Sequence, residues 1–237
     1  TVRVANGDLQ IDAYLARPLE GSYPGIVVFQ EIFGVNDHIR SVTDRIAREG
    51  YVAIAPALYQ RTAPGFEIGY EPDDFALGKE YKAQTTASEL LSDTEATIAY
   101  LKSLPSLKQG AIGSIGFCFG GHVAYLTATL SEIQAIASFY GAGIATMCPG
   151  ETEPTIARTK DISGTLYAFF GNEDASIPTE QVDRIEAELS KHNVAHKIFR
   201  YDGAGHGFFC DRRSSYNAEA AHDAWGKAME LFATVLK

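Results

Sequence analysis

The chain has 237 residues, of which 46% are hydrophobic and 21% charged, and its formal net charge is −10. This composition excludes collagen-like, low-complexity and disordered classes and predicts a packed core, and the length predicts a single domain over residues 1–237. The acidic excess argues against nucleic acid and anionic membranes as partners, because their phosphates attract clustered Lys and Arg.

Apolar patterning predicts the secondary structure. Residues 9–16 alternate apolar and polar side chains, which is typical of a half-buried antiparallel strand near a sheet edge. Short apolar runs predict buried strands at residues 25–29, 51–55, 111–117, 133–140, 165–170 and 194–201. Apolar residues at helical spacing predict intervening helices over residues 39–47, 90–101, 182–189 and 221–235. This alternation predicts an α/β fold, with a mostly parallel central sheet covered by helices on both faces.

Loops beyond the carboxyl ends of parallel strands are where ligands bind in such folds. The run at 111–117 leads into Gly-Phe-Cys-Phe-Gly at residues 116–120 and then into a helical pattern. Small residues on both sides of Cys118 suit a sharp strand-to-helix turn that exposes a nucleophile, and a helix N-terminus favours a thiolate. The alternative is that Cys118 is a small buried hydrophobe, the usual role of a free cysteine.

Two further candidates follow later strand runs. Asp174 comes after residues 165–170, and His206 comes after residues 194–201. Nucleophile, acid and histidine in this chain order match the catalytic triad of α/β-hydrolases. Considered alone, Asp174 is more simply explained as a helix cap or turn residue, and His206 as an ordinary loop histidine. Glu173 is the other candidate for the acid. Their shared placement at strand ends favours a triad of Cys118, His206 and Asp174.

The loop at residues 30–36 follows the strand run at 25–29 and contains Glu31 and Ile32. An oxyanion hole in this fold uses the N–H of the residue after the nucleophile and one N–H from this loop. The sequence therefore predicts Phe119 and Ile32 as the two donors. Taken alone, Glu31 is better explained as a surface carboxylate or a helix-initiating charge.

These motifs resemble the dienelactone hydrolase family, or carboxymethylenebutenolidases, of the α/β-hydrolase superfamily. The resemblance covers nearly the whole chain and rests on four segments, Gln30–Asn36, Ala55–Tyr59, Gly116–Gly121 and Gly205–Phe208. It implies a cysteine hydrolase that uses Cys118, His206 and Asp174. It also implies that Glu31 contacts the thiol before substrate binds.

Two departures from the family pattern concern the substrate. Family members that act on dienelactone hold its carboxylate with two arginines, one of them four residues after the catalytic histidine, where this chain has Cys210. No arginine lies between Arg61 and Arg158, where the second is expected, which leaves Lys79, Arg212 and Arg213 as possible substitutes. Aromatic residues are predicted to line an apolar acyl pocket: Phe33, Tyr59, Tyr81 and Phe208.

The sequence thus predicts hydrolysis of activated carboxylic esters or lactones through an acyl-enzyme, with a small molecule as substrate and no need for a cofactor or a metal ion. Three cysteines, an odd number, predict a reduced cytoplasmic protein, and the resemblance suggests a monomer. Two alternatives stay open. One is a redox-responsive or ligand-binding protein with little turnover, and the other is an acyltransferase or thioesterase.

Overall fold

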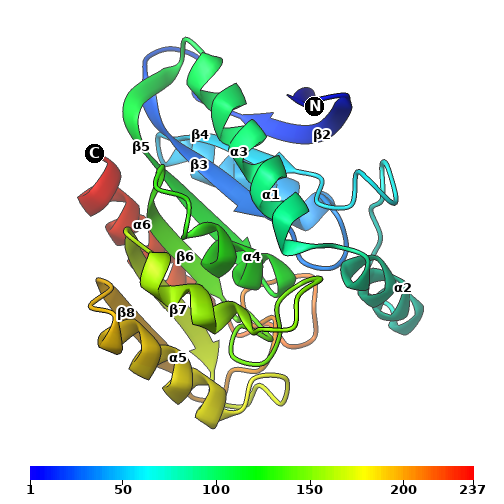
Figure 1. Cartoon of the computed structure of the whole chain (residues 1–237), viewed down its shortest axis with the longest axis vertical. Helices are drawn as coiled ribbons and strands as arrows, with labels where there is room; N and C mark the ends of the chain where they lie inside the picture. Colours follow the sequence, from blue (N-terminus) through cyan, green and yellow to red (C-terminus); the bar gives the residue numbers. More distant parts are fainter.

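The central feature of the computed structural model is one eight-stranded sheet with the strand order β1-β2-β4-β3-β5-β6-β7-β8 (Figure 1). The structure describes residues 1–237, apart from the side chain of Ala111. The strands are β1 Val2–Asn6, β2 Leu9–Ala16, β3 Tyr23–Phe29, β4 Val52–Pro56, β5 Leu107–Phe117, β6 Ile133–Phe139, β7 Thr165–Gly171 and β8 His196–Tyr201. Strand β2 is antiparallel to both of its neighbours, whereas every other neighbouring pair is parallel, so the predicted mostly parallel sheet is confirmed.

Helices cover both faces of this sheet. They are α1 Asp37–Arg48, α2 Pro72–Ala83, α3 Ala87–Ser103, α4 Phe119–Thr127, α5 Thr179–Lys191 and α6 Ala218–Leu236, with a short 3-10 helix at Thr155–Asp161. Helices α1 and α6 share one face, because the Arg45 guanidinium of α1 lies 3.8 Å from the ring centroid of Trp225 in α6. Helices α3, α4 and α5 lie in front of the sheet in Figure 1, and α6 lies behind it.

Apart from the short 3-10 helix, two elements were not predicted from the sequence. Strand β1 is short and sits at the edge of the sheet, where it pairs only with β2. Helix α2 begins at the end of a Pro/Gly-rich stretch, where the sequence predicted no helix. It begins with a capping box between Glu71 and Asp74, but Gly78 is its only buried residue. A helix that projects from the sheet without an apolar face shows no hydrophobic periodicity, so the pattern could not reveal it.

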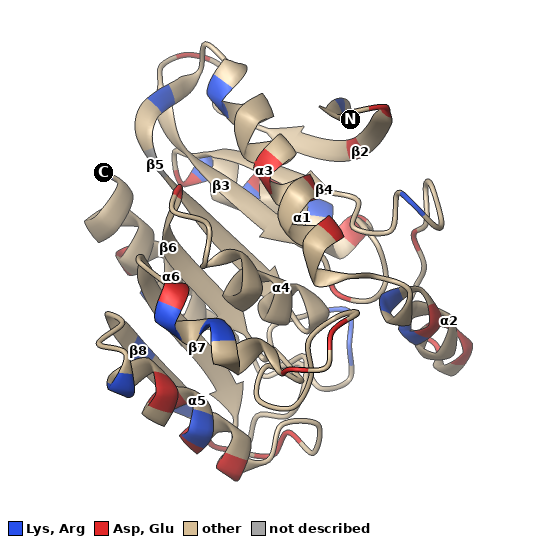
Figure 2. Ribbon diagram, in the orientation of Figure 1, with Lys and Arg blue, Asp and Glu red and all other residues tan. Residues whose placement is uncertain are grey.

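The sheet brings the candidate residues to one edge. Glu31, Cys118, Asp174 and His206 follow the carboxyl ends of β3, β5, β7 and β8, respectively. Strands β6 and β7 and helix α4 contain no Lys, Arg, Asp or Glu, and they are uniformly tan in Figure 2. Glu31 and Asp174, the buried acids at this edge, therefore lie beside apolar elements, where their attraction to an opposite charge is strong. Among the described residues, no helix is long and apolar enough to cross a membrane.

Candidate active site

Cys118 occupies a strained turn between β5 and α4. Its backbone has φ 56° and ψ −115°, and its N–H donates to the Phe139 carbonyl oxygen at 3.0 Å. A Cβ atom at Gly116 would lie 1.9 Å from the Gly120 carbonyl oxygen, so only glycine fits beneath the turn. A non-glycine residue held at positive φ stores about 1–3 kcal/mol of strain and is typical of functional sites. The half-buried thiol lies at the N-terminus of α4, as the strand-to-helix pattern predicts.

Gly120 is the second glycine that the turn requires. An added Cβ would lie 2.3 Å from the Phe29 carbonyl oxygen and 2.5 Å from that of Gln30. We expect Gly120→Ala to lower the free energy of unfolding by about 3 kcal/mol, because both obstacles are backbone atoms that can move only with their strand. Urea unfolding measures this change.

A matched control is Gly226→Ala, at an exposed site in α6 where an added Cβ meets nothing within 4 Å. Helix propensity alone predicts that both substitutions stabilise the protein, by about 0.5–1 kcal/mol. Equal stability of the two variants would show that α4 is not pressed against the end of β3.

A hydrogen bond joins the predicted acid and base. His206 Nδ1 lies 2.7 Å from Asp174 Oδ2, and the Asp174 side chain is fully buried. Asp174 Oδ1 accepts the Ser176 N–H at 2.8 Å, which orients the carboxylate. Glu173, the rival acid, is exposed. The structure therefore brings Asp174 rather than Glu173 to the histidine.

The pKa of His206 depends on its interaction with Cys118. Burial alone lowers the pKa of His206, but the negative charge of Cys118 and the hydrogen bonds that the ring makes to Asp174 and Cys118 outweigh burial and raise the pKa above its ordinary value. Because Nδ1 is engaged with Asp174, Nε2 is the ring nitrogen left for the thiol. This arrangement favours the protonated imidazolium form of His206.

Glu31 has a different partner from the one that the family resemblance implies. Its Oε1 accepts from Arg213 Nη1 at 3.0 Å, and its Oε2 has no hydrogen-bond partner among the described residues. Among the described residues, no hydrogen bond joins Glu31 to the thiol, and the guanidinium of Arg213, in the loop after β8, pairs with the buried carboxylate.

The two predicted oxyanion donors lie where α4 abuts the loop after β3. Phe119 is the first residue of α4, and the next residue, Gly120, approaches the Gln30 carbonyl closely. Gln30 fixes this loop, since its Oε1 accepts the Leu58 N–H at 3.1 Å. Within the described part of the chain, neither the Phe119 nor the Ile32 N–H donates a hydrogen bond, so both are available to a ligand.

The predicted pocket residues differ in exposure. Phe33 and Phe208 are fully buried, and Tyr59 is 2% exposed, whereas Tyr81 is only partly buried. Phe33 packs against Tyr70 and Phe75, Phe208 against Tyr140 and Tyr201, and Tyr59 against Phe119. Phe33, Tyr59 and Phe208 thus face other aromatic rings in this structure, and their lining of an apolar acyl pocket stays a prediction.

Three further residues lie next to the site, and sequence reasoning assigned a catalytic role to none of them. Tyr140 has φ 37°, and its buried hydroxyl has no hydrogen-bond partner among the described residues. Its ring lies 5.3 Å from that of His206, and its position directly after a strand was the available signal. Arg213 and Lys82 are the nearby cations, the latter 5.6 Å from the Phe119 ring, whereas Lys79 and Arg212 are exposed.

A mostly parallel sheet with a cysteine on the turn after β5, an acid after β7 and a histidine after β8 defines the α/β-hydrolase class. The chain is an α/β-hydrolase-fold protein. A profile of the dienelactone hydrolase family matches residues 11–236. The chain belongs to this family and is a dienelactone hydrolase-like hydrolase, as the motifs predict.

Similar proteins support this assignment. A Synechocystis protein named "Putative carboxymethylenebutenolidase" is 60% identical over 237 residues, which cover 100% of this chain and 96% of that protein. An Escherichia coli K12 protein with the same name is 33% identical, covering 96% of this chain and 83% of that protein. A crystal structure from Klebsiella pneumoniae, described as "Putative Dienelactone Hydrolase", superposes with a TM-score of 0.89 at 30% identity, covering 98% of this chain and 96% of that chain.

Proposed function

We propose that residues 1–237 form one monomeric, cytoplasmic hydrolase domain that cleaves activated carboxylic esters or lactones through an acyl-enzyme on Cys118. The observation that carries this proposal is the 2.7 Å contact between His206 Nδ1 and Asp174 Oδ2, next to a cysteine on a strained turn. The contact fixes the ring orientation and stabilises the imidazolium, as in nucleophile–histidine–acid triads.

In the proposed mechanism His206 Nε2 takes the proton of the Cys118 thiol, and the thiolate attacks the substrate carbonyl carbon. The N–H groups of Phe119 and Ile32 donate to the resulting oxyanion. Collapse of this intermediate breaks the ester C–O bond, and the leaving oxygen takes the proton from His206. His206 then removes a proton from water, the hydroxide attacks the thioester, and Cys118 leaves as a thiolate. No cofactor takes part in these steps.

Activated acyl groups suit this chemistry best. A thiolate is a better leaving group than an alkoxide, so the tetrahedral intermediate of a simple alkyl ester returns to reactants by expelling Cys118. Lactones, enol esters and thioesters have leaving groups that compete with the thiolate. We therefore propose these classes as substrates and expect simple alkyl esters to react slowly.

Detecting the acyl-enzyme tests the proposal directly. Rapid mixing with an activated aryl ester should give a burst of one equivalent of aryl alcohol and a mass increase equal to the acyl group on the peptide that contains Cys118. A protein that never acylates, yet accumulates an oxidised Cys118 with mild peroxide, would favour the redox-responsive alternative. Acyl products formed with added alcohols or thiols, in preference to water, would favour an acyltransferase.

For the natural substrate we propose a lactone that carries a carboxylate, in keeping with the names of the relatives, and Arg213 as the group that attracts this carboxylate. Its side chain is 10% exposed and lies against Glu31, so it reaches the site from a position three residues beyond Cys210. A hydrogen bond to a charged group contributes about 1.5–3 kcal/mol.

Arg213→Gln is therefore expected to lower kcat/KM for a carboxylate-bearing lactone about 10- to 100-fold more than for a neutral aryl ester. The ratio of the two substrates is the readout, because the variant also frees Glu31. Arg212→Gln, at an exposed neighbouring position, is the matched control and should leave both values unchanged. An equal fall in kcat/KM for the two substrates would mean that Arg213 acts only as the ion-pair partner of Glu31 and does not bind the substrate carboxylate.

A further inference from the structure

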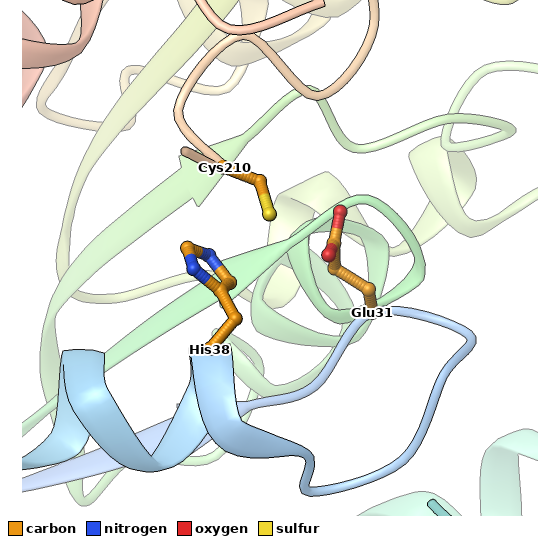
Figure 3. A group of neighbouring side chains, drawn as sticks. All are labelled: Glu31, His38 and Cys210. Carbon is orange, nitrogen blue, oxygen red and sulfur yellow. The ribbon is translucent and has the colours of Figure 1, made fainter. Parts of the chain in front are cut away.

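Three buried side chains from separate segments converge beside the proposed active site. Glu31 comes from the loop after β3, His38 from the first turn of α1, and Cys210 from the loop after β8, and the three point toward one another (Figure 3). One carboxylate oxygen, one imidazole nitrogen and the sulfur all lie within 4.8 Å of one another. The three residues are 1%, 5% and 0% exposed, respectively.

Two atoms of this cluster lack partners. Glu31 Oε2 and His38 Nε2 are buried without a hydrogen bond among the described residues. The other polar atom of each side chain faces a charged group, since Oε1 accepts from Arg213 at 3.0 Å and Nδ1 lies 3.6 Å from Asp211 Oδ1. A buried unsatisfied polar atom costs about 1–3 kcal/mol, so a further partner between Glu31 and His38 would stabilise the site.

We propose that Glu31 Oε2, His38 Nε2 and Cys210 Sγ bind a divalent metal ion of the zinc class. Carboxylate oxygen, imidazole nitrogen and thiolate sulfur together are a donor set that Zn²⁺ accepts, with a fourth position left to water. Tetrahedral zinc ligands at about 2.0–2.3 Å from the ion lie roughly 3.3–3.8 Å apart, so the cluster has to contract by about 1 Å. Side-chain rotation supplies movements of this size.

The surroundings of the three ligands resemble the outer contacts of metal sites. Metal-binding histidines usually have their second nitrogen held by a carboxylate, as Asp211 faces His38 Nδ1 here. Arg213 holds Oε1 of Glu31, so Oε2 is the oxygen available to the ion. Asn36 Nδ2 donates to the Tyr70 hydroxyl at 3.2 Å, which leaves the tyrosine proton free to stabilise the Cys210 sulfur.

Charge and access are both compatible with an ion. The Cys210 thiol releases its proton to solvent on binding, and the resulting thiolate, Glu31 and Asp211 together balance the two charges of the ion and the one of Arg213. A surface cavity of about 410 Å³, lined in part by His38 and Tyr70, provides an entry route. The sequence suggested no metal site, because the three ligands belong to no short spacing motif.

Cobalt titration tests the site with a readout other than activity. Co²⁺ bound to a thiolate gives a sulfur-to-metal charge-transfer band, and Zn²⁺ should displace it. The experiment uses the full chain with Cys118→Ser, which removes the other thiol of this region. A second substitution is then added to this background: Cys210→Ser, His38→Gln or, as the control, Cys148→Ser at a buried cysteine in the loop after β6. Thermal unfolding without metal checks that each variant is folded.

We expect one equivalent of Co²⁺ to bind with the band in the Cys118→Ser protein and its Cys148→Ser derivative. The band should disappear with Cys210→Ser, and the Kd should rise at least about 10-fold with His38→Gln, since each tenfold step corresponds to about 1.4 kcal/mol. A band that survives Cys210→Ser in a folded protein, or no band in the Cys118→Ser protein, would overturn the proposal. If the Cys118→Ser protein gives no band, a buried water molecule is the better partner for Glu31 Oε2 and His38 Nε2.

Discussion

Cys118→Ala is expected to lower kcat/KM for an activated aryl ester by at least about 10⁴-fold and to abolish the acyl adduct. Removal of a nucleophile leaves only the rate enhancement that the oxyanion donors and substrate binding supply. The strained backbone at Cys118, with φ 56°, has no other evident use than to present this side chain. Steady-state kinetics and intact-protein mass give both values from one preparation.

Two further variants make this prediction specific. Cys118→Ser keeps the size of the side chain but replaces the thiol by a hydroxyl that His206 deprotonates less readily, so its rate should also fall strongly. Cys148→Ser changes a cysteine that is buried away from the triad, and it should retain the wild-type rate. Wild-type turnover by both the alanine and the serine variant at position 118 would exclude a cysteine nucleophile.

Much of the fold could be predicted because most elements carry a clear apolar period. Strand β2 was predicted at its observed bounds, and every apolar run assigned to a buried strand overlaps an observed strand. The elements that escaped prediction lack this signal. Helix α2 buries only Gly78, and the edge strand β1 has only Val4 fully buried. The sequence signal for α2 is the capping box at its N-terminus. This signal is too weak to predict a helix next to a Pro/Gly-rich stretch, which is more typical of a loop.

The candidate site was predictable where it depends on strand ends. Parallel strands place their carboxyl ends at one edge, so Cys118, Asp174 and His206 could be grouped before their distances were known. The partner of Glu31 could not be predicted in this way. Arg213 reaches it from a long loop after β8, and the conformation of such a loop depends on packing against the loop after β3 and against α2 rather than on its own sequence pattern. Aromatic composition likewise could not separate the buried Phe33 and Phe208 from the partly exposed Tyr81.

The second large expected effect on catalysis comes from replacing the acid, Asp174. Asp174→Asn is expected to lower kcat/KM about 10³- to 10⁴-fold, because the amide neither balances the imidazolium charge nor holds His206 with Nε2 toward the thiol. The carboxylate is fully buried, so no solvent replaces its charge. Glu173→Gln is the matched control at the exposed neighbouring acid, and it should change the rate less than twofold.

The pH profile separates this role from a structural one. In the wild type, the charge of Cys118 and the hydrogen bond that His206 donates to Asp174 raise the pKa of His206 against the opposing effect of burial. Acylation uses the imidazolium to protonate the leaving oxygen, so kcat/KM falls as the pH rises through this pKa. Removing the carboxylate lowers the pKa, and the alkaline limb of the Asp174→Asn profile should therefore move to lower pH. An unchanged limb with a reduced rate would mean that Asp174 only supports the loop, whereas a larger loss in Glu173→Gln would transfer the role to Glu173.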